Sequence, residues 1–162
     1  MNQQFKIRFA HEDDAELILN FIKSLAVYEK MENDVVATIE SIKDSLFHKK
    51  QAEVIIGEEN GQPVGFALFY HNYSTFLGKA NLFLEDLFVY ESYRNKGYGK
   101  QMLSYLAKIA VERNCDRLDW WCLDWNTPSI EFYEKMGAKQ LNQWTVFRIQ
   151  GKNLAKLSNL NP

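Results

Sequence analysis

Features that mark many protein classes at first sight are scarce in this chain. Its only cysteines, Cys115 and Cys122, do not form a disulfide framework and lack the spacing of metal ligands. No apolar run is long enough to cross a bilayer, and the first five residues lack the basic-then-apolar form of a signal peptide. We therefore expect a cytoplasmic protein without a metal.

The charge is also too balanced to suggest nucleic-acid binding. The formal net charge is -2, so there is no basic excess to bind a phosphate backbone. The 162 residues suit a single domain (1–162) with one core, and 46% of them are hydrophobic. Aromatic residues, at 14%, are plentiful, and such residues often line binding sites as well as cores.

Apolar periodicity predicts strands and helices in a mixed order. The expected strands cover residues 5–9, 52–58, 64–70, 82–90 and 117–123, followed by a closing hairpin of 139–141 and 144–149. The expected helices cover residues 14–28, 38–47, 97–112 and 126–136, with a short tail helix near 154–157. This order predicts an α/β (α+β) domain around one mixed sheet, with a right-handed parallel crossover between 82 and 123.

A glycine-containing turn at Arg94, Gly97 and Gly99 connects a buried strand to a helix. Such a turn exposes backbone N–H groups at a helix N-terminus, where phosphate binds. It does not fit a Rossmann turn, because Met102 stands where the third glycine belongs. Nor does it fit a phosphate loop, because Gln101 replaces the required Ser or Thr.

Arg94-x-x-Gly97-x-Gly99 instead resembles the pyrophosphate-binding signature of the GCN5-related N-acetyltransferase (GNAT) family. Asn126, Ser129 and Tyr133 resemble a second family segment, with Ser129 replacing the commoner Ala. The resemblance covers residues 5–149. It implies a mixed sheet of about seven strands flanked by helices, whose fourth and fifth strands splay apart to admit the pantetheine arm of coenzyme A.

The resemblance implies acetyl-CoA as co-substrate and no metal. Glycines at the turn let backbone amides approach a pyrophosphate without a Cβ in the way, and Arg94 and Lys100 add positive charge. The cofactor-binding residues expected from the resemblance are Leu87, Phe88, Val89, Arg94, Asn95, Lys96, Gly97, Tyr98, Gly99, Lys100, Asn126, Ser129 and Tyr133.

Within the family, Tyr28-Glu29-x-Met31-Glu32 and Leu84-Glu85-Asp86 resemble the diamine (spermidine/spermine) N1-acetyltransferases and their thialysine-acetylating relatives. From charge alone, the acidic segment 28–34 is a solvated loop. The resemblance makes it a rim that attracts a small cationic amine. The residues expected to contact the substrate are Tyr28, Glu29, Glu32, Glu85, Asp119, Trp120 and Trp121.

An aliphatic ammonium must lose a proton before it attacks a thioester. Glu85 is the candidate base, directly or through water, and Tyr133 is the candidate acid for the leaving thiolate. A backbone N–H near Phe88 or Val89 would stabilise the oxyanion. Since strand residues alternate, we expect Glu85 and Asp86 to point to opposite faces, and the resemblance selects Glu85.

Several alternatives stay open. Trp120 and Trp121 suit the core and a dimer surface as well as an amine channel. The acceptor could also be an amino acid, a protein N-terminus or a protein lysine, and a coenzyme A-binding sensor without activity is the non-enzyme alternative. The resemblance further implies a homodimer, for which Trp144 and Phe147 could provide an interface.

Overall fold

The computed structural model of this protein describes residues 4–160. The chain forms two compact units, and each is considered by itself. The first unit extends to Leu123 and the second begins at Asp124. Among the described residues, no helix combines the length and the apolar character that a membrane span needs.

The first unit is built on a five-stranded sheet with the strands in chain order. The strands are β1 (Phe5–Phe9), β2 (Glu53–Glu59), β3 (Gln62–Ser74), β4 (Lys79–Val89) and β5 (Leu118–Trp120). The first four pair antiparallel, whereas β4 and β5 pair parallel, so the sheet is mixed as predicted. Asn60 and Gly61 turn β2 into β3 with positive φ at both residues, as an Asn-Gly hairpin requires.

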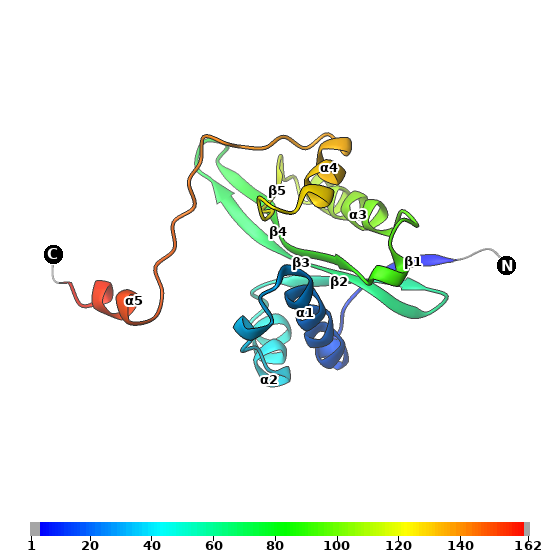
Figure 1. Cartoon of the computed structure of the whole chain (residues 1–162). Helices are drawn as coiled ribbons and strands as arrows, with labels where there is room; N and C mark the ends of the chain where they lie inside the picture. The colour runs from blue at the N-terminus through cyan, green and yellow to red at the C-terminus, as the bar shows by residue number, and fades with distance from the viewer. Residues whose placement is uncertain (1–3, 161–162) are drawn as a thin grey trace. The chain divides into compact units, whose positions relative to one another are not determined.

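Helices cover both faces of this sheet (Figure 1). One face carries α1 (Ala15–Glu29) and α2 (Ile39–Ile42), and α2 continues as a π-helical turn, Lys43–His48. The other face carries α3 (Tyr98–Glu112). Single helical turns at Glu12–Asp14, Glu32–Asp34 and Glu91–Tyr93 join the longer elements.

Aromatic rings join aliphatic side chains in the core between α1 and the sheet. Phe21 of α1 stacks on Phe66 of β3 with ring centroids 5.2 Å apart, and both side chains are fully buried. Phe88 of β4 pairs with Phe66 across the strands and joins the same cluster. Burying a side chain of this size contributes about 1.5–3 kcal/mol. This packing holds the inner face of β4 against α1.

The second unit contains α4 (Thr127–Lys135) and α5 (Gly151–Ser158). The α4 helix begins as predicted, because the Asn126 side chain accepts a hydrogen bond from the backbone N–H of Ser129. It ends before Gly137, whose φ of 91° is left-handed.

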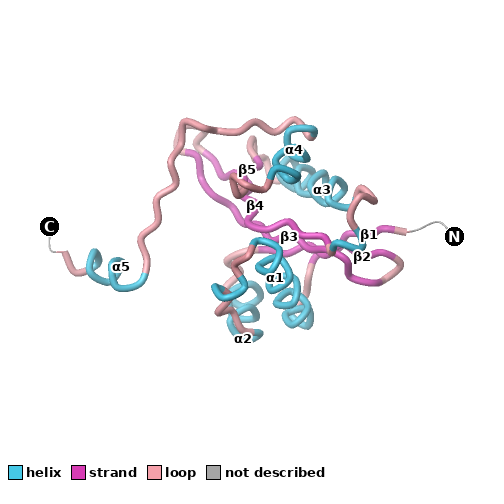
Figure 2. The backbone as a smooth tube through the Cα atoms, in the orientation of Figure 1, coloured by secondary structure: helices cyan, strands magenta, loops and turns pink. Residues whose placement is uncertain are grey.

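The predicted closing hairpin at 139–141 and 144–149 is wrong. These residues form a loop in Figure 2, and the described sheet has five strands rather than about seven. The β5 strand is also shorter than the predicted 117–123. The alternation in this segment favours a strand, but a strand needs a hydrogen-bonding neighbour, and no described strand pairs with it.

Candidate functional site

The β4 strand continues well past its parallel neighbour. Pairing between β4 and β5 ends at Leu84 and Trp120, so residues 85–89 of β4 have no partner on that side in the described sheet. The β5 strand itself ends at Trp120. An unpaired strand edge offers N–H and C=O groups to an extended ligand, as the arm of coenzyme A would be.

A β-bulge lies at the same point of β4. On β3, Leu68 pairs with Asp86 while the next residue, Phe69, pairs with Leu84, which leaves Glu85 as the extra residue. A bulge interrupts the alternation of side chains and redirects them. Regular alternation therefore does not hold across Glu85 and Asp86, and the expectation that they point to opposite faces does not follow from it.

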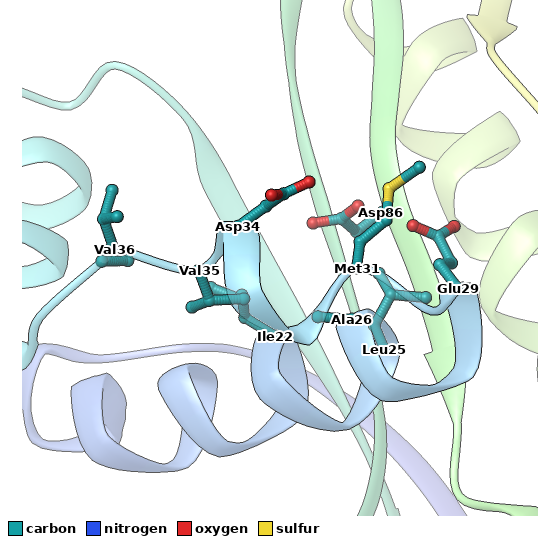
Figure 3. A pocket seen from close by; sticks show the side chains of 10 residues that line it. Ile22, Leu25, Ala26, Glu29, Met31, Asp34, Val35, Val36 and Asp86 are labelled. Carbon is teal, nitrogen blue, oxygen red and sulfur yellow. The ribbon is translucent and has the colours of Figure 1, made fainter.

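A pocket of ≈ 330 Å³ lies between the end of α1, the turn after it and β4. Figure 3 shows three carboxylates on one side of this pocket, those of Glu29, Asp34 and Asp86, with apolar side chains below them. The remaining lining residues are Ile22, Leu25, Ala26, Met31, Val35, Val36 and Ala37. Three acids on apolar walls suit an ammonium group carried on an aliphatic chain.

Two of the pocket's carboxyl groups have raised pKa values. Burial, together with the neighbouring negative charges of Glu85 and Glu29, raises the pKa of Asp86 to about 7. Burial also raises the pKa of Glu29. No lysine, arginine or histidine is among the described residues that line the pocket. No basic side chain in this described lining neutralises the acids, and the ammonium group of a bound amine would do so.

The glycine turn follows β4 directly. Asn95 and Gly97 have positive φ angles of 62° and 80°, and α3 begins at Tyr98. The first i to i−4 bond of the helix runs from the Gln101 N–H to the Gly97 carbonyl, so the N–H groups of the first turn have no partner within the helix. This N-terminus, after an open strand edge, fits the pyrophosphate and arm of coenzyme A.

The side chains of Lys96 and Tyr98, at this turn, contact other parts of the fold. Lys96 forms a salt bridge with Glu59 at 2.8 Å, and the Tyr98 hydroxyl donates a hydrogen bond to the same carboxylate. The buried Tyr98 ring also stacks on Phe5, with centroids 4.1 Å apart. These contacts fix the turn against β1 and β2. Lys100, one turn into α3, is exposed.

Arg94 and Tyr28 contact each other instead of lining the pocket. The Arg94 guanidinium lies over the Tyr28 ring, and its Nε donates to the Val89 carbonyl. Leu87 is half-buried and pairs with Ala67 of β3.

The structure separates the other predicted substrate residues. Glu29 lines the pocket, whereas Glu32 is exposed outside its lining, and Glu85 is also exposed. Trp121 is 59% exposed and meets the Phe83 ring edge-on at 5.5 Å. On β5, Asp119 and Trp120 are half-buried opposite Phe83 and Leu84.

Sequence reasoning missed Asp34 and Asp86 as pocket residues. Asp86 is an acid in an apolar strand, but alternation allows only one of Glu85 and Asp86 to face the substrate, and the resemblance selects Glu85. Asp34 belongs to the acidic segment 28–34, of which the resemblance selects Tyr28, Glu29 and Glu32 but not Asp34.

The predicted residues of the second unit lie on α4 and at its start. Asn126 is buried and caps the helix at Ser129. Tyr133 is half-buried, with its ring 5.2 Å from that of Phe132. The role of Tyr133 as the acid stays a prediction. Among residues 4–160, no group of three or more potential ligands could hold a metal ion.

Comparison with known proteins supports one family throughout. A model of the acetyltransferase (GNAT) family matches residues 15–138. The chain is 34% identical to the thialysine N-epsilon-acetyltransferase of Sus scrofa, covering 94% of this chain and 96% of the relative. It is 32% identical to the human spermidine/spermine N(1)-acetyltransferase-like protein 1, covering 95% of this chain and 24% of that longer protein. A solved Vibrio cholerae integron cassette protein superposes with a TM-score of 0.80 and 27% identity, covering 96% of this chain and 98% of that one.

Proposed function

We propose, since this chain belongs to the acetyltransferase (GNAT) family, that it transfers the acetyl group of acetyl-CoA to a primary amine of a linear di- or polyamine such as spermidine. Family membership makes the chain an N-acetyltransferase; the acetyl donor and the acceptor are the parts that we infer. The acidic pocket of Glu29, Asp34 and Asp86 carries the inference.

The pocket favours a polyamine because its charges and its walls match one. A polyamine alternates ammonium groups with methylene segments, which would meet the three carboxylates and the apolar side chains of α1 respectively. An amino acid such as thialysine brings a carboxylate of its own, which three acids would repel. Thialysine is nevertheless the second candidate, because a relative that matches almost the whole chain is named for it.

The proposed reaction gives each of these residues a role, and the roles of Asp86, Glu29 and Glu85 are argued from their places at or beside the pocket. Asp86 and Glu29 would bind the ammonium group, and the exposed Glu85 would accept its proton through water. As the amine nitrogen bonds to the thioester carbon, an N–H at the end of β4 would stabilise the oxyanion. After releasing the first proton to solvent, Glu85 would take up the second amine proton as the C–S bond breaks. Tyr133 would protonate the departing thiolate and regain its own proton from solvent.

An acceptor panel tests the proposal. The purified protein is incubated with acetyl-CoA and spermidine, putrescine, thialysine or lysine, and thiol release and product mass are measured. We expect the highest kcat/KM with spermidine. Thialysine as the best acceptor would move the assignment to the second candidate. Coenzyme A binding without amine-dependent thiol release would contradict the proposal and favour a sensor.

We also place the enzyme in the cytoplasm. Its two cysteines support that location, because Cys115 and Cys122 are both free thiols and Cys115 is buried. A tagged protein that fractionates with soluble cytoplasmic enzymes would agree.

A further inference from the structure

The Arg94 side chain is held by two groups of the protein. Its Nε donates a hydrogen bond of 2.9 Å to the Val89 carbonyl. Its guanidinium carbon lies 4.7 Å from the centre of the Tyr28 ring and 5.6 Å from that of Phe88. Among residues 4–160, no salt bridge includes Arg94. The carbonyl and the rings, rather than a carboxylate, therefore hold this charge.

The groups that hold Arg94 belong to the two walls of the acidic pocket. Tyr28 is the second-last residue of α1 and directly precedes Glu29. Val89 is the last residue of β4 and follows Asp86 by three positions. Arg94 therefore bridges the ends of the two elements that carry these acids.

Arginine suits this position in a way that lysine does not. A guanidinium is planar, so it can donate in its plane while its face lies on an aromatic ring. A lysine ammonium is a point charge that cannot make both contacts with the same geometry. The Arg94 backbone lies at the start of the turn that leads to Gly97. Its guanidinium nevertheless lies against Tyr28 of α1.

We propose that Arg94 is a positioning residue for the acceptor amine. Its side chain holds the ends of α1 and β4 together and so fixes Glu29 relative to Asp86. This inference rests on the proposed function, because it assigns the acidic pocket to the amine. It differs from the role expected of Arg94 as a positive charge for the pyrophosphate.

The two roles predict different losses. A cation that only met the pyrophosphate would affect coenzyme A binding, and lysine would replace it in part. A positioning residue affects amine binding even without the cofactor, and lysine fails as a substitute. Arg94→Gln and Arg94→Lys separate the two roles.

The first experiment measures spermidine binding to cofactor-free protein by calorimetry. We expect both variants to bind spermidine at least about fivefold more weakly, as the loss of one cation–π contact supports. The matched control is Arg113→Gln, because Arg113 also lies over a ring (5.8 Å from Phe69) and pairs with Glu53. That control should lose stability and keep its spermidine affinity. Unchanged spermidine affinity in Arg94→Gln, with weaker coenzyme A binding, would overturn the inference.

The second experiment needs no ligand. Urea unfolding is measured for Arg94→Gln, Tyr28→Leu and the double variant. We expect the double variant to lose clearly less stability than the two single losses together, because either substitution alone removes the shared contact. Additive losses would refute the bridge. A wild-type protein that binds no spermidine would sink the proposed function, and this cycle would then decide whether Arg94 bridges α1 and β4.

Discussion

Asp86 is an acid in surroundings that oppose its ionisation. Its pKa is raised from 3.8 to about 7, mainly by burial and in smaller part by the negative charges of Glu85 and Glu29. The unfolded chain releases this proton near pH 4, whereas the folded chain keeps it until about pH 7. The unfolded state therefore binds fewer protons in this window, and stability falls as the pH rises from about 4 to 7.

Asp86→Asn should accordingly stabilise the protein at high pH. We expect the variant to melt a few degrees above wild type at pH 8, and the difference to shrink toward pH 5, because asparagine never bears the buried charge. Thermal melts from pH 5 to 8.5 measure this. Asp13→Asn, at an exposed position, is the control and should give no such trend. A difference that stays constant with pH would contradict the role of ionisation.

The same substitution should weaken amine binding. An ionised Asp86 attracts an ammonium group, and losing a hydrogen bond to a charged group costs about 1.5–3 kcal/mol, so we expect KM for spermidine to rise at least about tenfold. In the wild type this KM should fall as the pH rises through about 7. Glu85→Gln should instead lower kcat more than it changes KM, as a base would. Steady-state kinetics from pH 6 to 8.5 distinguish the two variants. Identical effects of Asp86→Asn and Glu85→Gln on kcat and KM would refute the assignment of binding to Asp86 and of proton acceptance to Glu85.

At the scale of elements, the sequence predicted the strand, glycine turn and helix that surround the site. Apolar runs and a glycine turn depend on local preferences, which is why β4 and α3 lie close to their predicted ranges. The bulge at Glu85 was not predictable, because it depends on how β3 and β4 pair. The hairpin at 139–149 failed for a similar reason: alternation describes a strand's faces and says nothing of its neighbours.

Gly65 allows β3 and β4 to approach closely where the site begins. A Cβ at this residue would lie 2.7 Å from the Phe88 carbonyl oxygen and 3.0 Å from the Val89 side chain. The carbonyl cannot move without shifting the end of β4, so Gly65→Ala should cost about 1–3 kcal/mol of stability. It should also reduce kcat/KM, because β4 carries the pocket and the proposed oxyanion donor.

Urea unfolding and steady-state kinetics measure both effects. Gly78→Ala is the matched control: Gly78 has a positive φ of 69° but nothing within 4 Å of an added Cβ. It should lose stability through backbone strain and keep its kinetics. Normal stability in Gly65→Ala would show that β4 tolerates the shift.

At the scale of the whole molecule, several large apolar side chains are exposed in the segment that does not form the predicted hairpin. Trp144 is 73% exposed and Phe147 is 90% exposed, and Val146 and Ile149 are also exposed. Exposed apolar groups gathered in one segment indicate a protein partner. We propose that this partner is a second copy of the chain.

The double variant Trp144→Ser/Phe147→Ser tests that partner. We expect the wild type to be a dimer by light scattering at micromolar concentration, and the variant to be a monomer, because it removes the two largest exposed rings of the segment. Phe76→Ser is the matched control, since Phe76 is 95% exposed in the turn between β3 and β4, and it should remain a dimer. A monomeric wild type, or a double variant that stays dimeric, would show that the segment serves another purpose.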